Sequence, residues 1–378
     1  MRSQRLFPRV LILFGILTVT VSVSAQVQIG LVSYLEGTVE IVRQGALLNA
    51  SMISYGDPVF MHDVVQTGSD SYAEVELTGQ SGAGSTIRVN ENSAYYVEVD
   101  PLPTGSNDSG DTKIRLLGGS VEIAVQQLRP GARFSVQTNT AVLGVRGTTF
   151  DVLTAPDETT LLGVREGKVL LVAQGGTVEA AAGTAAEAQA SGEPTVKPVP
   201  DGDFVGFYED WEATRLAVFR SGASTFVVAY ARRYQDTVDD FNAAYRDLAQ
   251  YRAKIQDAVR TPPSMGELAL LKMETGPALI RMRSILPLFE NVVYRLRELE
   301  RLHRQGIGMT TIDGRPSSDF FRAFSAQQQR LTVELSAVRY IFDLYRRLDE
   351  QSFGGMPGSN VPSSNVPQGA GSLGGAQF

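Results

Sequence analysis

The sequence predicts a multidomain protein of the α and β class, with a β-rich first part and an α-helical second part. Between residues 27 and 180, apolar residues alternate with polar ones, which is the period of half-buried strands. From residue 204, apolar residues recur every three or four positions, as in amphipathic helices. Residues 181–203 show neither period and contain three prolines. This segment is therefore the predicted boundary between the two parts.

Short strands punctuated by Gly, Asn, Asp and Ser are expected in the first part, at 27–42, 72–77, 86–99, 113–117, 120–125, 133–138, 149–154 and 168–173. A short phrase recurs among them, in which a glycine precedes x-Val and further alternating apolar residues. It reads LEGTVEIV at 35–42, LGGSVEIAV at 117–125 and REGKVLLVA at 165–173. A glycine at such a place supplies a positive φ for a tight corner. The unequal spacing, about 82 and 48 residues, excludes a strict solenoid repeat.

The second part is expected to fold as an antiparallel α-helical bundle. One apolar helical face runs from Tyr234 to Val259, and another runs from Leu331 to Leu348. Between them, residues 265–304 are helical in pattern but contain Pro277 and Pro287, which are expected to split or kink the helix. The aromatic residues of these faces are interpreted as bundle core. The predicted boundaries are a signal peptide (1–25), a β domain (26–183), a linker (184–203), the bundle (204–351) and a disordered tail rich in Gly, Ser, Asn and Pro (352–378).

The N-terminus has the pattern of a secretory signal peptide. Three arginines precede the apolar run VLILFGILTVTVSV, and Val23-Ser24-Ala25 suits cleavage after Ala25. The alternative is an uncleaved membrane anchor, for which the apolar run is short. We therefore expect a periplasmic or otherwise exported protein whose mature chain begins at Gln26.

Composition excludes several kinds of partner and site. The chain has 378 residues, a net charge of −7 and no cysteine, so disulfides and thiolate metal sites are excluded. Residues 26–200 contain 20 acidic and 10 basic side chains, and an acidic, exported chain disfavours nucleic acid. The acidic loop 101–111 lacks the spacing of a calcium-binding EF-hand. The two histidines, His62 and His303, are interpreted as a loop residue and a helix-end cation, and no metal or cofactor is expected.

The segment TNTAVLGVRGTTFDV (138–152) places one arginine between two glycines inside an apolar run. It does not match the phosphate-binding P-loop, and no helix pattern follows it. No histidine or nucleophile elbow accompanies its hydroxyl residues, and the sequence contains no enzyme signal. We interpret it as a structural corner in which Arg146 is buried and satisfies backbone carbonyls, or pairs with a carboxylate. The residues of this motif are Gly144, Val145, Arg146, Gly147, Thr148 and Phe150.

This segment resembles the most specific motif of the FecR domain family, T-x-x-A-x-x-G-V-R-G-T-x-F. The resemblance extends over about residues 30–180, through further matches at 55–57, 63–68, 71–77, 85–88, 92–93 and 164–169. It implies an all-β domain that is solenoid-like or sandwich-like. The family's namesake is a periplasmic sensor that passes a signal from an outer-membrane receptor to a cytoplasmic sigma factor. Only about nine residues precede the apolar run here, and helices replace the domain that usually follows, so the resemblance implies the fold more strongly than that role.

Three functions are consistent with the sequence. The favoured one is a non-catalytic envelope protein whose FecR-like domain is a scaffold or protein-interaction module, with a helical interaction arm. Envelope proteins or cell-wall polymer would be its partners; the oligomeric state is not determined by the sequence. A glycan- or polymer-binding module is the first alternative, with stacking surfaces from Tyr34, Tyr95, Tyr96 and Trp211. The second alternative is a periplasmic signalling component related to sigma-factor regulators.

Overall fold

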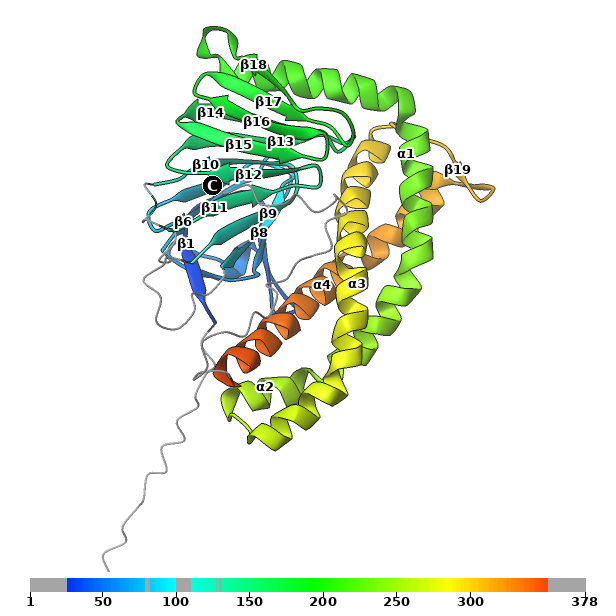
Figure 1. The fold of residues 1–378 in the computed structure, drawn as a ribbon. Coiled ribbons are helices and arrows are strands. Elements are labelled where there is room, and N and C mark those ends of the chain that lie inside the picture. The colour runs from blue at the N-terminus through cyan, green and yellow to red at the C-terminus, as the bar shows by residue number, and fades with distance from the viewer. Residues whose placement is uncertain (1–25, 79–81, 100–109, 127, 129–130, 353–378) are drawn as a thin grey trace, which may run out of the picture.

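The computed structural model describes residues 26–352, except 79–81, 100–109, 127 and 129–130. Two β-sheets face each other as a sandwich, and long helices lie on its outside (Figure 1). This arrangement confirms the predicted fold class, a solenoid-like or sandwich-like β region followed by helices. The predicted signal peptide (1–25) and the tail from residue 353 onward lie outside the described residues.

The sheet that we call sheet A has nine strands within the described residues. In spatial order they are β18 (Thr195–Pro198), β17 (Thr184–Ala188), β14 (Thr160–Glu166), β13 (Thr149–Thr154), β10 (Ser120–Ala124), β7 (Thr86–Val89), β6 (Tyr72–Leu77), β1 (Gln28–Glu36) and β4 (Pro58–Phe60).

Sheet B also has nine strands in this part of the chain. They are β16 (Gly176–Ala181), β15 (Lys168–Ala173), β12 (Ala141–Val145), β11 (Phe134–Gln137), β9 (Thr112–Gly118), β8 (Ala94–Val99), β5 (Val64–Thr67), β2 (Val39–Arg43) and β3 (Ala46–Leu48). A small hairpin of β19 (Thr311–Ile312) and β20 (Arg315–Pro316) lies among the helices.

Two kinds of connection alternate along most of the sandwich. A hairpin joins neighbouring strands of one sheet, and a tight turn, here called a corner, carries the chain from one sheet to the other. The corners at Gly37, Gly119 and Gly167 have φ values of 73°, 83° and 80°. Each is a glycine of the recurring Gly-x-Val phrase, so the predicted positive φ is confirmed at all three copies. A side chain there would also clash, because a Cβ on Gly119 would lie 2.2 Å from the Ser93 hydroxyl of the neighbouring corner.

The corners change sides of the sandwich partway along the chain. β10 begins at the corner at Gly119, and its first residue, Ser120, pairs with Leu153 near the end of β13. The start of β13, and the corner that precedes it, therefore lie at the opposite edge of the sandwich. The cause is the connection from β10 to β11, which crosses between sheets where a hairpin would otherwise occur. β11 consequently runs parallel to β9, while the other described strand pairs are antiparallel.

This reversal gives the sandwich two different edges. The first, which we call the helix edge, has the corners at 37–38, 68–71, 90–93 and 119, together with the hairpin turns at 138–140 and 155–159. The second, which we call the free edge, has the corners at 146–148, 167 and 182–183. Between the sheets lies an apolar core that includes Ile87, Tyr95, Ile114, Phe134 and Phe150.

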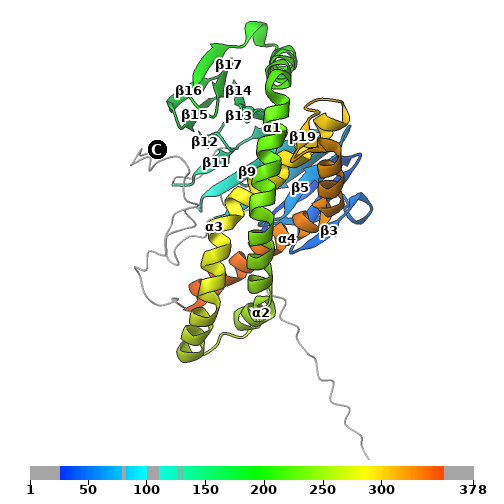
Figure 2. The ribbon, with the colours of Figure 1, turned by 90° about the vertical axis from the view of Figure 1, so that its right-hand side faces the viewer.

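The helices are α1 (Phe204–Ala249), α2 (Arg252–Arg260), α3 (Met265–Arg304) and α4 (Ser317–Ser352). α1 and α3 run antiparallel and side by side, and α4 crosses them (Figures 1 and 2). Tyr234 and Phe241 of α1 stack on Phe289 of α3, with ring centroids 6.1 and 4.1 Å apart. The aromatic faces are therefore bundle core, as the sequence predicted.

The helices hold the sandwich at two places. The first turns of α1 cover the outer face of sheet A, where Phe204 and Trp211 pack on Leu153, Leu161 and Ala185. The helical core continues onto the outer face of sheet B through Val42, Val64, Ala94, Tyr96 and Leu117. Figure 1 shows that α1 begins beside β18 and then turns down along the sandwich. A Ser-Gly pair at 221–222, with the Ser221 hydroxyl donating to the Val218 carbonyl at 2.7 Å, is a sequence at which helices bend.

Two sequence interpretations need correction here. Residues 184–203 are not a linker, because 184–198 form β17 and β18, and β17 pairs with β14 over five residues. The prolines do not split the third helical segment, since α3 is continuous through Pro277 and Pro287. Pro277 is exposed, so water can satisfy the carbonyl that its missing N–H leaves free.

A glycine in β14 shows how closely α1 lies on sheet A. The Tyr208 hydroxyl donates to Asp151 Oδ2 at 2.7 Å and lies directly over Gly163, where a Cβ would be 1.8 Å from that hydroxyl oxygen. Asp151 is buried and also accepts from Arg165 Nε at 2.8 Å. A side chain at position 163 must displace the tyrosine from a buried carboxylate.

We therefore expect Gly163→Ala to lower the free energy of unfolding by about 1–3 kcal/mol, since it disrupts a hydrogen bond to a buried charge. Urea denaturation measures this. Gly118→Ala is the matched control, because Gly118 is also a strand glycine but has no atom within 4 Å of its Cβ position. Equal stability of the two variants would contradict the assigned contact.

Candidate interaction site at the free edge

The glycine-arginine motif forms the first corner of the free edge. Val145 ends β12 inside the core, and Thr148 and Phe150 are buried where the chain enters β13. Gly147 has a φ of 62°, and the corner at Gly167 packs directly against it: a Cβ on Gly167 would lie 2.5 Å from the Thr148 methyl and 3.0 Å from the Gly147 carbonyl oxygen. The third corner continues the stack, since the Ala182 amide donates to the Gly167 carbonyl at 3.0 Å.

Arg146 does not occupy the position that the sequence predicted. It is exposed at the apex of the corner, and within the described residues its guanidinium forms no hydrogen bond or ion pair. The expectation of a buried arginine that satisfies carbonyls is therefore wrong. The corner's backbone groups are instead satisfied by strand pairing and by the bond from the Val125 amide to the Thr148 carbonyl at 2.8 Å. Gly144, in β12, has an extended φ, so its role is separate from that of Gly147.

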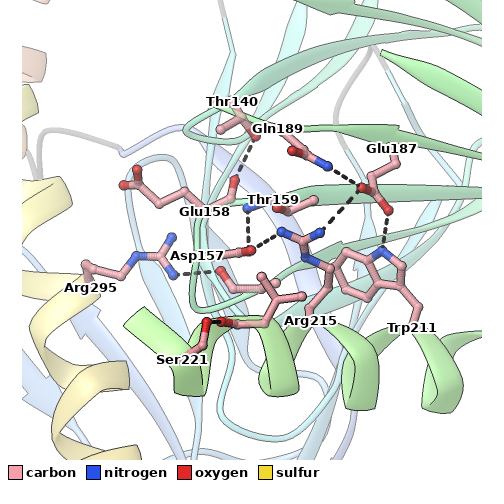
Figure 3. Close-up of polar contacts among 12 residues, drawn as sticks. Thr140, Asp157, Glu158, Thr159, Glu187, Gln189, Trp211, Arg215, Ser221 and Arg295 are labelled. Carbon is pink, nitrogen blue, oxygen red and sulfur yellow. Dashed lines mark hydrogen bonds and ion pairs between the residues drawn. The ribbon is translucent and has the colours of Figure 1, made fainter. Parts of the chain in front are cut away.

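The helix edge differs from the free edge, because the charged side chains of its hairpin turn at 155–159 are paired with helix residues. The hairpin turn between β13 and β14 is inserted between α1 and α3 (Figure 3). Asp157 forms an ion pair with Arg215 of α1, and Arg295 of α3 donates to the Ala155 carbonyl at 2.8 Å. Glu158 accepts from the Tyr230 hydroxyl of α1, and its backbone carbonyl accepts from Thr140 at 3.0 Å.

Glu187 of β17 joins the same cluster to the start of α1. It accepts from Trp211 Nε1 at 2.8 Å and from Gln189 at 2.9 Å, and it lies 3.8 Å from Arg215 (Figure 3). Each of the other charged side chains has a partner of opposite sign, and the Glu158 carboxylate accepts from Tyr230. The cluster therefore positions the helices, and we assign it no ligand.

Both histidines lie in structural positions. His303 is in the last turn of α3, buried, with Nε2 2.8 Å from the Ser317 hydroxyl and its ring 4.6 Å from that of Phe321. Burial lowers the pKa of His303, and the nearby Glu300 only partly opposes this. His303 is therefore neutral near pH 7, and the prediction that it is a helix-end cation is wrong. His62 is a turn residue with a φ of 66°, and burial lowers its pKa too.

The four proposed stacking residues do not form a common surface. Tyr95, Tyr96 and Trp211 are buried, and only Tyr34 is exposed among them. Tyr95 belongs to the sandwich core, Tyr96 lies under α4 with the Arg339 guanidinium 4.4 Å from its ring centroid, and Trp211 packs on sheet A. The expected aromatic platform for a polymer is thus absent from these residues.

No group of three or more His, Cys, Asp or Glu side chains in the described chain is placed to hold a metal ion. Among the helices described, none is long and apolar enough to cross a membrane. That the protein is not an enzyme and needs no cofactor stays a prediction.

The fold is thus a two-sheet β-sandwich braced by helices, with the glycine-arginine corner exposed at one edge. The family model described as "FecR protein" matches residues 63–170, from just before β5 into β15. The matched segment contains the reversal and the Arg146 corner, and it excludes the helices.

Two crystal structures described as a "putative anti-sigma factor" from Parabacteroides distasonis ATCC 8503 are similar to part of the chain. The one at 1.65 Å resolution is 20% identical, covers 39% of this chain and 64% of that chain, and has a TM-score of 0.31. The one at 2.50 Å is also 20% identical, with coverages of 36% and 59% and a TM-score of 0.29. The chain therefore spans less than two thirds of either structure. No curated protein matches it significantly.

The corner geometry separates the roles of two adjacent residues. We expect Arg146→Ala to change the free energy of unfolding by no more than about 0.5 kcal/mol, because the side chain is exposed and unpaired. Gly147→Val should lower it by about 1–3 kcal/mol, because a β-branched residue is strained at this positive φ. Thermal and urea denaturation of both variants measure this. Strong destabilisation by Arg146→Ala would show that the arginine is structural after all.

His303 should make stability depend on pH. Its folded-state pKa lies below the unfolded value of about 6.5, so the unfolded chain binds the proton more readily. Its contribution is complete above pH 6.5 and is lost as the pH falls below that value. The stability gap between wild type and His303→Asn, measured in urea at several pH values from 8 to 5.5, should narrow toward acid. A constant gap would contradict the assignment.

Proposed function

We propose that this is a non-catalytic, exported protein of the cell envelope, whose FecR-like sandwich is a scaffold and protein-interaction module. One observation carries the proposal: Arg146 is exposed at the apex of the motif that marks the domain, and its guanidinium pairs with no other residue of the described chain. A residue required only for folding would be expected to contact the fold. The neighbouring positions Thr148 and Phe150 do so, and Arg146 does not.

The chemistry of the free edge indicates what this arginine binds. A guanidinium presents five N–H donors in a planar fork that matches a carboxylate in two-point geometry. The other exposed cation of these corners, Lys168, is already paired with Glu179 at 2.7 Å. Arg146 is therefore the cation of these corners that remains available, and we propose an acidic group of a protein partner as its ligand.

The helices support the scaffold part of this proposal. They cover parts of both outer faces and close over the helix edge through the Asp157 and Arg295 contacts. A partner is thereby directed to the corners of the free edge at 146–148 and 167, where Arg146 and Glu166 are exposed. The helices are also proposed to form an interaction arm of their own.

The location in the envelope is proposed from the N-terminal pattern of arginines, apolar run and small residues before Gln26. The absence of cysteine fits an exported chain whose stability comes from packing. We favour protein over cell-wall polymer as the partner, since three of the four aromatic side chains that a polymer would stack on are buried.

A signalling role related to sigma-factor regulators is the second candidate. The FecR match over residues 63–170 favours it. It uses the same free edge, with a receptor or regulator as the partner, and differs from the first candidate in requiring the N-terminal apolar run to stay attached as an anchor.

Site-specific cross-linking in the producing cells tests the proposal. A photo-reactive residue at the exposed position Glu166, on the corner next to Arg146, should form an adduct with an envelope protein. In that adduct, the chain that carries the photo-reactive residue should begin at Gln26. Arg146→Glu in the same chain should reduce the adduct by about tenfold, since charge reversal opposes an acidic partner.

The control is the same photo-reactive residue at Val218, which is exposed on α1. The amount of any adduct formed from position 218 should not change in the Arg146→Glu variant. An adduct from position 166 that is unaffected by Arg146→Glu, in a variant that melts like wild type, would exclude Arg146 as the binding residue. Retention of residues 1–25 in the adduct would favour the signalling candidate.

A further inference from the structure

The outward face of α3 carries a continuous apolar stripe. It consists of Leu270, Met273, Pro277, Ile280, Ser284 and Leu288, which we call the α3 stripe. Leu270, Met273 and Ile280 are 66%, 77% and 73% exposed, and Leu288 is 52% exposed. Single exposed apolar residues are normal on a protein surface, but a contiguous row indicates a contact surface.

The spacing of the stripe is that of a helix-packing face. Its residues follow one another at steps of three, four, three, four and four, so they lie in one line on the helix surface. From Leu270 to Leu288 the line is about 27 Å long at 1.5 Å per residue. No stripe position is charged. The face is therefore suited to another helix of similar length.

Within the described residues, the fold does not use this face. The residues that α3 contributes to the helical core lie on its other side, and they include Leu271, Leu279, Met282 and Phe289. In both views the N-terminal half of α3 projects beyond the sandwich together with α2 (Figures 1 and 2). The stripe is thus accessible to a partner.

The charges beside the stripe are arranged asymmetrically along the helix. Glu267 and Glu274 accompany its N-terminal half, and Arg281 and Arg283 accompany its C-terminal half, all four exposed. Two such helices side by side in parallel would place like charges together. In the antiparallel orientation the acidic half of one meets the basic half of the other. The stripe is therefore complementary to itself.

We infer that two copies of this chain form a dimer in which their α3 stripes pack antiparallel. The two-fold axis lies near Pro277 and Ile280, so that Leu270 of one copy approaches Leu288 of the other. The same patch is buried on both copies, as two-fold symmetry requires. Glu274 of one copy then faces Arg281 of the other.

The flanking residues already have partners within the chain, and these do not compete with the dimer. Glu274 pairs with Lys254, and Arg281 Nη1 lies 2.8 Å from Asp247. Both side chains remain nearly half exposed, and a guanidinium has five donors. The ion pairs across the dimer would thus select the orientation, while the apolar stripe supplies most of the affinity.

The molar mass in solution provides the first test. The protein purified from producing cells should have twice the mass of one chain by light scattering at micromolar concentration. Met273→Glu and Ile280→Glu should raise the dissociation constant by about tenfold or more, because each buries a charge in the stripe. Val218→Glu is the matched control, since it adds the same charge at an exposed apolar position on α1 and should leave the dimer intact.

The orientation is tested by disulfides, because the natural chain has no cysteine. Leu270→Cys alone should not cross-link to itself, and Leu288→Cys alone should behave in the same way. A mixture of the two variants should form a mixed disulfide upon oxidation. Self-linkage of each single variant would show parallel packing and overturn the antiparallel assignment.

Three results would overturn the dimer itself. A wild-type monomer at high micromolar concentration is the first, and a dimer unchanged by Ile280→Glu is the second. The third is a monomer that dimerises only when the chain is shortened to end at residue 352, since the C-terminal segment would then be the occupant of the stripe. None of these measurements involves Arg146, so failure here is distinct from failure of the proposed function.

Discussion

The parallel pairing of β9 with β11 determines where every later corner of the sandwich emerges. Between β5 and β10, corners lie at the helix edge and hairpins at the other. Two successive cross-sheet connections, at Gly119 and then between β10 and β11, exchange these positions. The hairpin turn at 155–159 thereby reaches the helices, and the corner with Arg146 reaches solvent. Parallel pairing is slightly weaker per residue than antiparallel pairing. The consequence of the reversal is therefore the placement of the hairpin turn and of the Arg146 corner, and not a gain in sheet stability.

The same exchange explains why the charged hairpin turn at 155–159 meets the helices. Arg215 and Arg295 enter from two different helices, and their partners Asp157 and the Ala155 carbonyl come from one hairpin turn. Buried ion pairs add little net stability compared with apolar packing, but loss of one partner leaves an uncompensated charge. Such contacts allow the helices only one position on the sandwich. The apolar contacts of Trp211 and Phe204 with sheet A then stabilise that position.

Much of this architecture was predictable from periodicity. The alternation before residue 180, the helical period after 204 and the glycines at 37, 119 and 167 predicted the strands, the helices and three corners. The placement of Arg146 was not predictable, because a charge in an apolar run satisfies the period whether the chain passes through the core or turns outward. The flanking Gly147, with its positive φ, was the signal for the outward turn.

The linker was misassigned for a different reason. Residues 184–188 read as Thr-Ala-Ala-Glu-Ala, which has little apolar volume. Ala185 is buried under the first turns of α1, and Ala186 and Ala188 are buried in the core between the sheets. Small residues in a sheet under a helix look like a linker when the helix is unknown. The exposed row on α3 was also hidden in the sequence, since periodicity alone does not show which of two apolar faces the fold buries.

The edge at which Arg146 emerges depends on whether the number of unpaired crossings between the sheets before it is even or odd. Each corner moves the chain from one sheet to the other, and each hairpin returns it to the same edge without changing the alternation. If a complete hairpin and its corner are inserted or lost, every later corner therefore stays at the same edge of the sandwich. Only an unpaired crossing, such as the one between β10 and β11, inverts it. A lineage can lengthen or shorten this sandwich by whole units while keeping the arginine on the same side.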